Sequence, residues 1–403
     1  MDFKERKVYE NPQQLLKERK QLFQDAIRHD VKPKRVPILS HAFTWKAFDA
    51  GYNLKEYFYD YEKRFDAVCQ HHEKYEMDSC MELGTRNMFQ VSDLIGGSPY
   101  IVDENQSYFN VVDEAMMDED EYEVVFQDGS FKFRFERGIA AKHGLTREQI
   151  VNRIAEIAPQ AKIELDLAAE YTRKINDQFI NKFGVPSVMK AMGMNPPDNL
   201  SGHGYRGMAG FARDMRRQPD NVKRMLDMIH EQTWPMTQKI LDTYNPEGDD
   251  TACVAMRMVS LSHTLLSKDQ FGKYSWPYMK RFIDEIVKRN WTGILFLEGA
   301  VQHIIDYLKE IPEGHFGLLI EKEDPVKLKK QLPNATIIGG YPSNLLYAAN
   351  EQQCIDAAKR IIDEAAYDGN YIFTTDAMLS YPEDGKGANM KAVVDFVKEY
   401  GKY

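Results

Sequence analysis

The stretch that decides the fold runs from residue 293 to residue 375: GILFLEGAVQHIIDYLKEIPEGHFGLLIEKEDPVKLKKQLPNATIIGGYPSNLLYAANEQQCIDAAKRIIDEAAYDGNYIFTT. It contains four short apolar runs, at residues 293–298, 315–321, 335–340 and 370–375, and helical patterns at residues 300–311, 325–331 and 351–367 separate them. Buried strands that alternate with helices predict a parallel sheet covered on both faces. With the helix expected at residues 388–399, these are four consecutive strand-helix units, which favour a closed barrel over an open sheet.

The same alternation extends outward from this stretch. Strands are expected at residues 36–43, 78–84 and 251–258, and helices at residues 56–75, 146–158, 163–183, 220–244, 269–290 and 388–399. Residues 100–138 differ, because polar and apolar residues alternate on both sides of Asp128-Gly129, which is a hairpin signal. We therefore predict an eight-stranded (β/α) barrel over residues 1–403 as one domain, with an N-terminal helical extension and a β-hairpin insertion at about residues 99–138.

Composition limits the partners. The net charge of −10 argues against nucleic acid, whose phosphates need a basic surface. No apolar run is long enough to span a membrane, and no signal peptide is visible, so a cytoplasmic protein is expected. The four cysteines form no CxxC pair that would indicate a metal or disulfide framework. A homodimer is compatible with the sequence.

Active sites of such barrels lie at the carboxyl ends of the strands. This rule selects eight side chains: His41, Glu82, Met256, Arg257, Glu298, Glu321, Tyr341 and Asp376. Glu298 and Asp376 each close an apolar strand, where a carboxylate is costly unless it is paired or binds something. We expect these two carboxylates to lie together in a central pocket. The alternative is that they are capping or ion-paired groups with a structural role.

Several segments resemble the uroporphyrinogen decarboxylase superfamily. They include PILSHAFTWKAFDAGYNLKEYFYDYEKRFDA (37–67), SLSHTLLSKDQFGKYSWPYMKRFIDEI (260–286), IIGGYPSNLLYAANEQQCIDAAKRIIDEA (337–365) and YIFTTDAMLSYPEDGKGANMKAVVDFVKEY (371–400). The resemblance extends from about residue 35 to residue 401 and implies the barrel fold. The decarboxylase subgroup has an arginine-rich motif after its first strand, whereas SHAFTWKAFDAGY has one lysine and no arginine. Asp78 lies near the position of that subgroup's catalytic aspartate, but we do not transfer the role.

The other large branch of the superfamily is the corrinoid-dependent methyltransferases. Its thiol-using members carry a zinc motif H-x-C-G on the fifth strand and a further cysteine on the last strand. The matching positions here are Phe296, Glu298 and Asp376. Carboxylates make a harder site than thiolates, which suits an oxygen substrate. The resemblance therefore implies an O-demethylase that transfers the methyl group of a methoxylated aromatic compound to cob(I)alamin on a separate corrinoid protein.

For this hypothesis the catalytic residues are Glu298, Asp376 and His41, and Glu298 and Asp376 could hold Zn²⁺ or a proton. Residues expected to contact the substrate are Phe43, Glu82, His203, Met256, Arg257, His263, Phe296, Tyr341 and Met378. Three alternatives stay open. They are a methylcorrinoid:acceptor methyltransferase, a porphyrinogen-like decarboxylase and a non-catalytic binding homologue.

Overall fold

The computed structural model describes residues 6–81, 89–95, 100–111, 115–193, 195–202 and 204–403. Its main sheet has eight parallel strands in the order β1-β2-β5-β6-β7-β8-β9-β10. Their bounds are β1 (Leu39–Ser40), β2 (Ser79–Cys80), β5 (Ser187–Gly193), β6 (Ala252–Ser260), β7 (Gly293–Leu297), β8 (Phe316–Ile320), β9 (Thr336–Gly339) and β10 (Tyr371–Ile372). A parallel bridge between Ile38 and Phe373 joins the two edges, so the sheet forms a nearly closed barrel as predicted.

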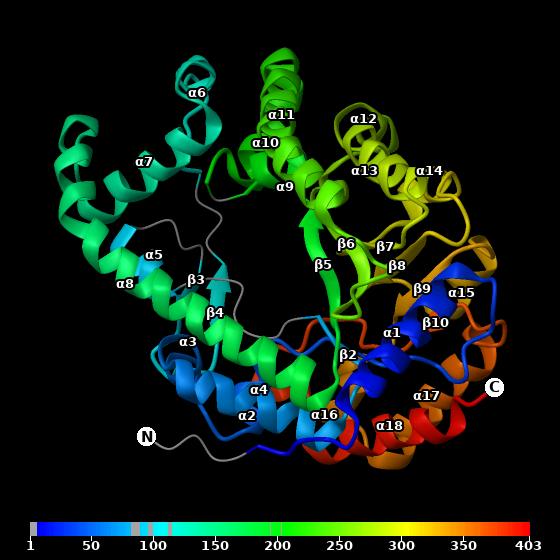
Figure 1. Cartoon of the computed structure of the whole chain (residues 1–403). Helices are drawn as coiled ribbons and strands as arrows, with labels where there is room; N and C mark the ends of the chain where they lie inside the picture. Colours follow the sequence, from blue (N-terminus) through cyan, green and yellow to red (C-terminus); the bar gives the residue numbers. More distant parts are fainter. Residues whose placement is uncertain (1–5, 82–88, 96–99, 112–114, 194, 203) are drawn as a thin grey trace.

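Helices surround this sheet (Figure 1). In the first half of the chain they are α2 (Trp45–Asp49), α3 (Leu54–Tyr59), α4 (Tyr61–Tyr75), α5 (Phe89–Ile95), α6 (Tyr122–Asp128), α7 (Ser130–His143), α8 (Ile150–Asp177), α9 (Pro196–Leu200), α10 (Gly207–Arg217) and α11 (Pro219–Thr243). In the second half they are α12 (Lys268–Tyr274), α13 (Trp276–Lys288), α14 (Ile305–Leu308), α15 (Pro325–Gln331), α16 (Ser343–Ala348), α17 (Glu351–Ala365) and α18 (Gly387–Tyr400). Short 3-10 turns η1 (Arg147–Gln149), η3 (Ser262–Leu265), η4 (Gln302–Ile304) and η5 (Pro382–Asp384) and a π turn η2 (Gln178–Phe183) complete the chain. Within the described ranges, none of the helices has the length and apolarity needed to cross a bilayer.

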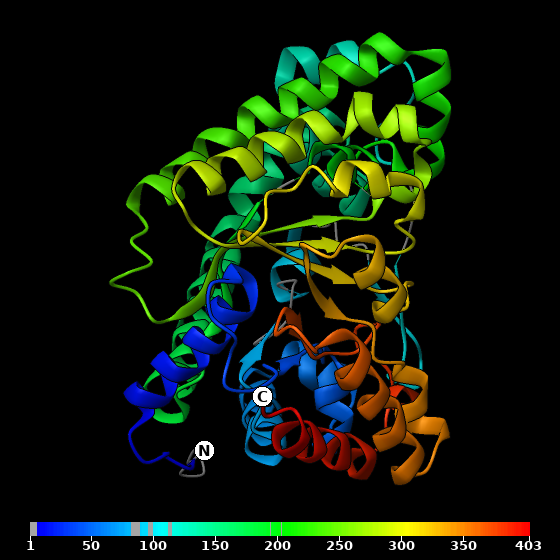
Figure 2. The same cartoon turned by 90° about the vertical axis from the view of Figure 1, so that its right-hand side faces the viewer.

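The predicted N-terminal helical extension is α1 (Pro12–Arg28), which covers the amino-terminal end of the barrel (Figure 2). Its residues Phe23, Ala26 and Ile27 are buried against the strands. They belong to the barrel-interior cluster, whose members are Phe23, Ala26, Ile27, Leu39, Met81, Val188, Cys253, Val254, Ile294, Phe296, Leu319, Ile338 and Ile372. A second set of strand residues, including Leu295, Leu297, Leu318 and Ile320, packs outward against the helices. The strands are therefore buried on both faces, which explains their continuous apolar runs.

Several helices begin where the sequence supplies a cap. Asp324 accepts backbone N–H groups of Val326 and Lys327, and Pro325 follows at the first helical position of α15. Asn350 and Gln353 form a capping box at the start of α17. Such caps satisfy the free N–H groups of a first turn and fix where each helix starts.

The insertion contains a hairpin, although in a shorter stretch than predicted. Strands β3 (Tyr100–Val102) and β4 (Phe109–Val111) pair antiparallel. The expected hairpin around Asp128-Gly129 is wrong, because residues on its two sides form α6 and α7. Tyr122 and Val125 are three residues apart and both fully buried, so packing against neighbouring helices favours a helix there. Gly129 still breaks the chain, with a φ of 88° that suits glycine.

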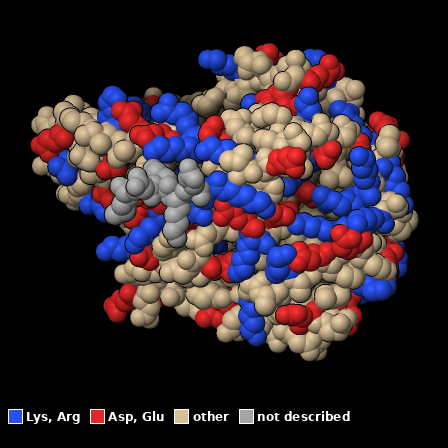
Figure 3. Space-filling model, turned by 60° about the horizontal axis from the view of Figure 1, so that its bottom comes forward, with Lys and Arg blue, Asp and Glu red and all other residues tan. Residues whose placement is uncertain are grey.

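Two further differences concern the segment that follows. The helices expected at residues 146–158 and 163–183 are joined in α8, which contains Pro159 in its interior. The sequence analysis did not indicate β5, whose alternating burial includes the exposed Lys190. In Figure 1, α7 and α8 lie on the left of the molecule, and α6 follows them toward α11, which it contacts through the ion pair of Glu123 with Arg224. One face of the molecule carries interspersed acidic and basic side chains (Figure 3). The prediction that residues 1–403 form one domain stays a prediction.

Candidate active site

Three predicted side chains meet inside the barrel. The ring of His41, directly after β1, lies edge-on to Phe296 of β7, with ring centroids 5.5 Å apart. The guanidinium carbon of Arg257 on β6 lies 5.9 Å from the centroid of the same Phe296 ring. All three residues are at most 3% exposed. Together they form an aromatic floor that carries an imidazole and a guanidinium group.

Two thioethers lie beside the Arg257 guanidinium. Its Nη2 donates to the sulfur of Met192 at 3.4 Å, and its Nη1 donates to the sulfur of Met81. Thioether sulfur is a weak acceptor, so both contacts are weak hydrogen bonds.

Glu298 is half-buried directly after β7, two residues beyond Phe296. Its backbone N–H donates to the carbonyl of Ser260 at 3.0 Å, which continues the ladder between β6 and β7. Side chains alternate along a strand, and Phe296 points into the barrel. The same alternation, continued one step past the end of β7, assigns Glu298 to the inner side.

Asp376 is also half-buried, after β10. Its Oδ1 accepts the backbone N–H of Ser343 at 2.9 Å, at the start of α16. In the order of strands β10 is three positions from β7, so Asp376 and Glu298 follow strands that are not neighbours in the sheet, and their meeting in one pocket stays a prediction. At least one oxygen of this carboxylate thus has a capping role.

Two of the residues predicted to contact substrate lie in the outer layer. Met256 is fully buried in the cluster that packs the strands against the helices. Tyr341 is in the same cluster, and its hydroxyl donates to the carbonyl of Cys354 in α17 at 3.2 Å. Burial raises the pKa of the Tyr341 phenol. Their packing gives both side chains a structural role.

Phe43 and Met378 belong to a different cluster, beside the β3–β4 hairpin. Phe43 is buried against Phe109 of β4, with ring centroids 6.0 Å apart, and the half-buried Met378 packs against the same cluster. The inserted hairpin thus contributes to the surroundings of the first strand's carboxyl end. Glu82 and His203, which were also predicted to contact substrate, lie outside the described residues.

His263 is fully buried in η3, after β6. Its ring is stacked on His303 with centroids 5.9 Å apart, and His303 Nε2 donates to the His263 carbonyl at 2.9 Å. Burial lowers the pKa of His263 to about 4, so its imidazole is neutral at physiological pH. This pair holds the loops after β6 and β7 together.

The sequence analysis missed two polar residues that fix the same region. Asp198, in α9, accepts the backbone N–H groups of Leu261 and Ser262 at 2.8 and 2.6 Å. The Asn195 amide donates to Asp198 Oδ2 at 2.6 Å, and burial raises the pKa of the Asp198 carboxyl. Both residues follow β5. Because the sequence analysis did not predict this strand, it gave no reason to place the Asn-Pro-Pro-Asp segment at a strand end.

The number of donor groups that lie close together decides whether a metal ion can be held. A protein zinc site usually has at least three His, Cys, Asp or Glu ligands. Among the described residues, no group of three such side chains lies close enough together to hold a metal ion. The described residues alone thus supply no complete set of zinc ligands, and the binding of a metal by Glu298 and Asp376 stays a prediction.

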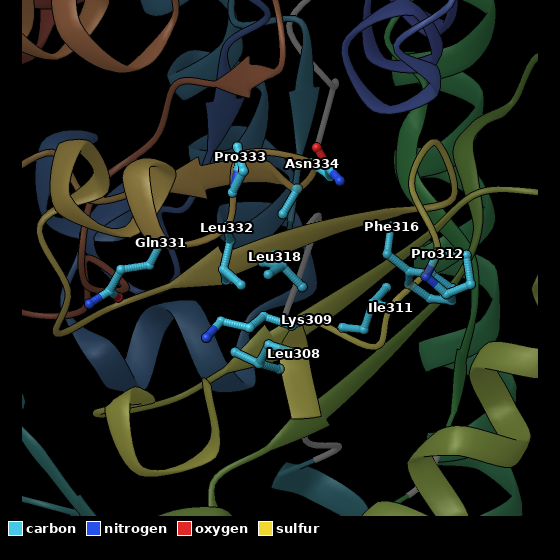
Figure 4. Close-up of a pocket in the computed structure, with 11 residues that line it drawn as sticks. Leu308, Lys309, Ile311, Pro312, Phe316, Leu318, Gln331, Leu332, Pro333 and Asn334 are labelled. Atoms are coloured by element: carbon cyan, nitrogen blue, oxygen red, sulfur yellow. The ribbon is translucent and has the colours of Figure 1, made fainter. Parts of the chain in front are cut away.

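Two features at the other end of the barrel are separate from this site. A cavity of about 250 Å³ lies between α14 and α15, lined by Leu308, Ile311, Phe316, Leu332 and Asn334 among others (Figure 4). Its described lining includes none of the side chains predicted for the site.

Asp78, before β2, accepts two hydrogen bonds from Arg35 at 2.7 and 2.6 Å and one from the Ile38 N–H at 2.9 Å.

A barrel with polar side chains at the carboxyl ends of its strands has the architecture of an enzyme. The model of the family described as "Uroporphyrinogen decarboxylase (URO-D)" matches residues 130–400, about two thirds of the chain. The chain therefore belongs to the uroporphyrinogen decarboxylase family.

Two individual proteins are similar to this chain. A curated "Uroporphyrinogen decarboxylase" of Anaeromyxobacter dehalogenans (strain 2CP-C) is 25% identical over 137 residues, which cover 34% of this chain and 38% of the relative. The match thus spans well under half of that relative. A solved "methyltransferase from Methanosarcina mazei" superposes with a TM-score of 0.60 at 15% identity, covering 95% of this chain and 98% of the other. This second likeness shows a shared fold.

Proposed function

We propose that this chain is a methyltransferase that demethylates a methoxylated aromatic compound and transfers the methyl group to cob(I)alamin on a separate corrinoid protein. Two observations support this proposal: the buried edge-on contact of His41 with the Phe296 ring, and the half-buried Glu298 two residues beyond Phe296, at the carboxyl end of β7. An aromatic floor with a carboxylic acid at its edge fits a flat apolar ring with one ether oxygen.

The reaction breaks the bond between the methyl carbon and the ether oxygen. Cob(I)alamin from the partner supplies the electron pair for the new bond to the methyl group, and the aryl oxygen leaves with the electrons of the broken bond. An unassisted phenolate leaves slowly, so a proton given to the oxygen in the transition state accelerates the step. Glu298 would give this proton, and the aromatic floor would hold the ring in line.

The resemblance of the sequence supports this choice of substrate. Relatives that use thiols have thiolate ligands at the positions of Glu298 and Asp376, whereas this chain has carboxylates at both. A carboxylic acid acts on oxygen by donating a proton and does not require a metal. The corrinoid protein would dock at the carboxyl ends of the strands, where Glu298 lies.

The test uses the purified chain, a corrinoid protein reduced to cob(I)alamin, and guaiacol or veratrole as the methyl donor. We expect the visible absorbance of cob(I)alamin to change to that of methylcobalamin, with release of the demethylated phenol. The reaction should require both proteins. Absence of turnover with both donors, while the same corrinoid protein accepts methyl groups from methyl iodide, would refute the proposal.

A second candidate is a decarboxylase of a porphyrinogen-like acid. Arg257 favours it, because a buried guanidinium in the barrel interior attracts a substrate carboxylate. Incubation of the chain with uroporphyrinogen, without any corrinoid protein, distinguishes the two candidates. Release of CO₂ and formation of porphyrinogens with fewer carboxylates would establish the decarboxylase and exclude the first proposal.

A further inference from the structure

Glu298 has a neighbouring carboxylate on the next strand. In the parallel pair of β7 and β8, Phe296 is in register with Leu319, and Leu297 is in register with Ile320. Phe296 and Leu319 both point into the barrel, whereas Leu297 and Ile320 both point outward. Glu298 and Glu321 directly follow this last pair, and continuing the alternation assigns both to the inner side, after two adjacent strands that are about 4.8 Å apart.

Glu321 also holds the peptide that follows Glu298. Its Oε2 accepts the backbone N–H of Gly299 at 3.1 Å. Gly299 has a φ of 90°, and a Cβ atom at this position would lie 2.7 Å from the Thr264 side chain. The backbone here is thus fixed by a conformation that only glycine adopts easily and by one carboxylate.

A second carboxylate of the same loop fixes the chain slightly further on. Glu323 accepts the backbone N–H of Val301 at 3.0 Å and the Gln302 amide at 3.0 Å. Glu321 and Glu323 have the same chemistry, and both accept a backbone N–H of the segment after β7. Only Glu321 holds the residue adjacent to Glu298.

We propose that Glu321 is the positioning residue of Glu298. Its hydrogen bond from the Gly299 N–H fixes the backbone next to Glu298. This places the Glu298 carboxyl where it can reach the ether oxygen of the substrate. This inference rests on the role of Glu298 in the proposed function. A displacement of about 1 Å in a reacting group can reduce the rate about a hundredfold.

The experiment compares four variants in the demethylation assay with guaiacol: Glu321→Ala, Glu321→Gln, Glu298→Gln and the double variant Glu298→Gln with Glu321→Ala. Glu321→Ala removes the acceptor, so we expect kcat to fall about a hundredfold with KM unchanged. Glu321→Gln retains an acceptor oxygen, so we expect a loss of no more than about fivefold. If Glu321 acts through Glu298, the double variant should be no slower than Glu298→Gln alone.

Glu323→Ala is the matched control, because it removes the same kind of bond two residues further along. It should change kcat less than about fivefold. Additive losses in the double variant, equal losses in Glu321→Gln and Glu321→Ala, or a loss in Glu323→Ala as large as in Glu321→Ala would overturn the inference alone. Full activity of Glu298→Gln would overturn the proposed function and the inference with it. Thermal unfolding of each variant verifies that the barrel is intact.

Discussion

The imidazole of His41 meets the ring of Phe296 edge-on inside the barrel, with an angle of 76° between the ring planes. His41 directly follows β1 and Phe296 lies in β7, two strands that are far apart in the chain. Edge-to-face contacts of this kind add about 0.5–1.5 kcal/mol to the burial of the rings. The floor of the candidate site is therefore held by packing between β7 and the residue that follows β1.

Replacing Phe296 by Ala should lower the free energy of unfolding by about 3–5 kcal/mol, because a fully buried ring leaves a cavity in the interior. Phe296→Leu keeps most of the volume and should cost about 1.5 kcal/mol or less. Both variants should raise the KM for an aromatic donor, since the ring that faces the substrate is gone. Urea unfolding and initial rates measure the two effects. A loss below about 1 kcal/mol for Phe296→Ala would show that the ring is not packed as described.

Glu298→Gln keeps the size of the side chain and removes its acidic proton. If Glu298 protonates the leaving oxygen, demethylation of guaiacol should fall by about two to four orders of magnitude, the usual contribution of general acid catalysis. The free energy of unfolding should change by about 1 kcal/mol or less, since no cavity forms.

The control for this variant is 4-nitroanisole, whose nitrophenolate leaves without help. Glu298→Gln should lose much less activity on this donor than on guaiacol. Equal losses on the two donors would mean that Glu298 only holds the substrate or the fold. Full activity on guaiacol would remove the chemical basis of the proposal.

Much of the barrel could be predicted from the sequence, because its second half consists of apolar strands between amphipathic helices. The helix expected at residues 325–331 begins and ends where α15 does, since Asp324 and Pro325 mark its start. The predicted hairpin at Asp128-Gly129 failed for a long-range reason. Tyr122 donates a hydrogen bond to the buried Asp214 of α10, a contact that favours helical spacing and that no local pattern reveals.

The candidate site was less predictable than the fold, because a side chain at a strand end can face inward or outward. Met256 and Arg257 are adjacent on β6, and only Arg257 lies over Phe296 in the interior. A shift of one residue along a strand turns its side chain to the opposite face of the sheet. The strand ends predicted from sequence are uncertain by more than one residue. The contact of Glu321 with Gly299 depends on the register of β7 and β8, which the sequence does not contain.

Two variants of Asp376 distinguish a capping role of its carboxylate from a catalytic role. Asp376→Asn retains an oxygen that can accept the Ser343 N–H, so stability should change by no more than about 0.5 kcal/mol. Asp376→Ala removes the cap and should cost about 1 kcal/mol. If the carboxylate also takes part in proton transfer, both variants should lose at least tenfold in demethylation rate. Asp376→Asn with full activity would leave Asp376 only its capping role.

Asp78 is predicted to be structural, because it pairs with Arg35 at the amino-terminal end of the barrel. Asp78→Asn removes the charge that faces this guanidinium. The cost should be about 2–3 kcal/mol, below that of a fully buried pair, since Arg35 is partly exposed to water. The folded variant should retain its demethylation rate, measured at a temperature well below its unfolding midpoint. Loss of activity in a folded Asp78→Asn variant would give Asp78 a role in the reaction.

His72 should make the protein sensitive to acid. Its ring is buried in α4 between Phe183 and Phe179, with centroids 4.7 and 5.5 Å away. Burial, assisted by the positive charge of Arg19, holds the pKa of His72 well below its usual range. The unfolded chain binds a proton at this residue below its ordinary pKa of about 6.5, whereas the folded chain does not. Stability is therefore fully present above about pH 6.5 and is lost as the pH falls below it.

His72→Phe removes the group that titrates and keeps an aromatic ring beside Phe179 and Phe183. Between about pH 6 and pH 5, the free energy of unfolding of the native protein should fall more steeply than that of the variant, by up to about 1.4 kcal/mol per pH unit. Part of the acid sensitivity should remain, because burial also holds the pKa of His71 well below its usual range. Phe179→Leu is the matched control: it should lower stability by a similar amount at both pH values, since it changes packing and not titration. Urea unfolding at pH 7.5, 6 and 5 measures these slopes, and identical slopes for His72→Phe and the native protein would show that His72 is protonated equally in both states.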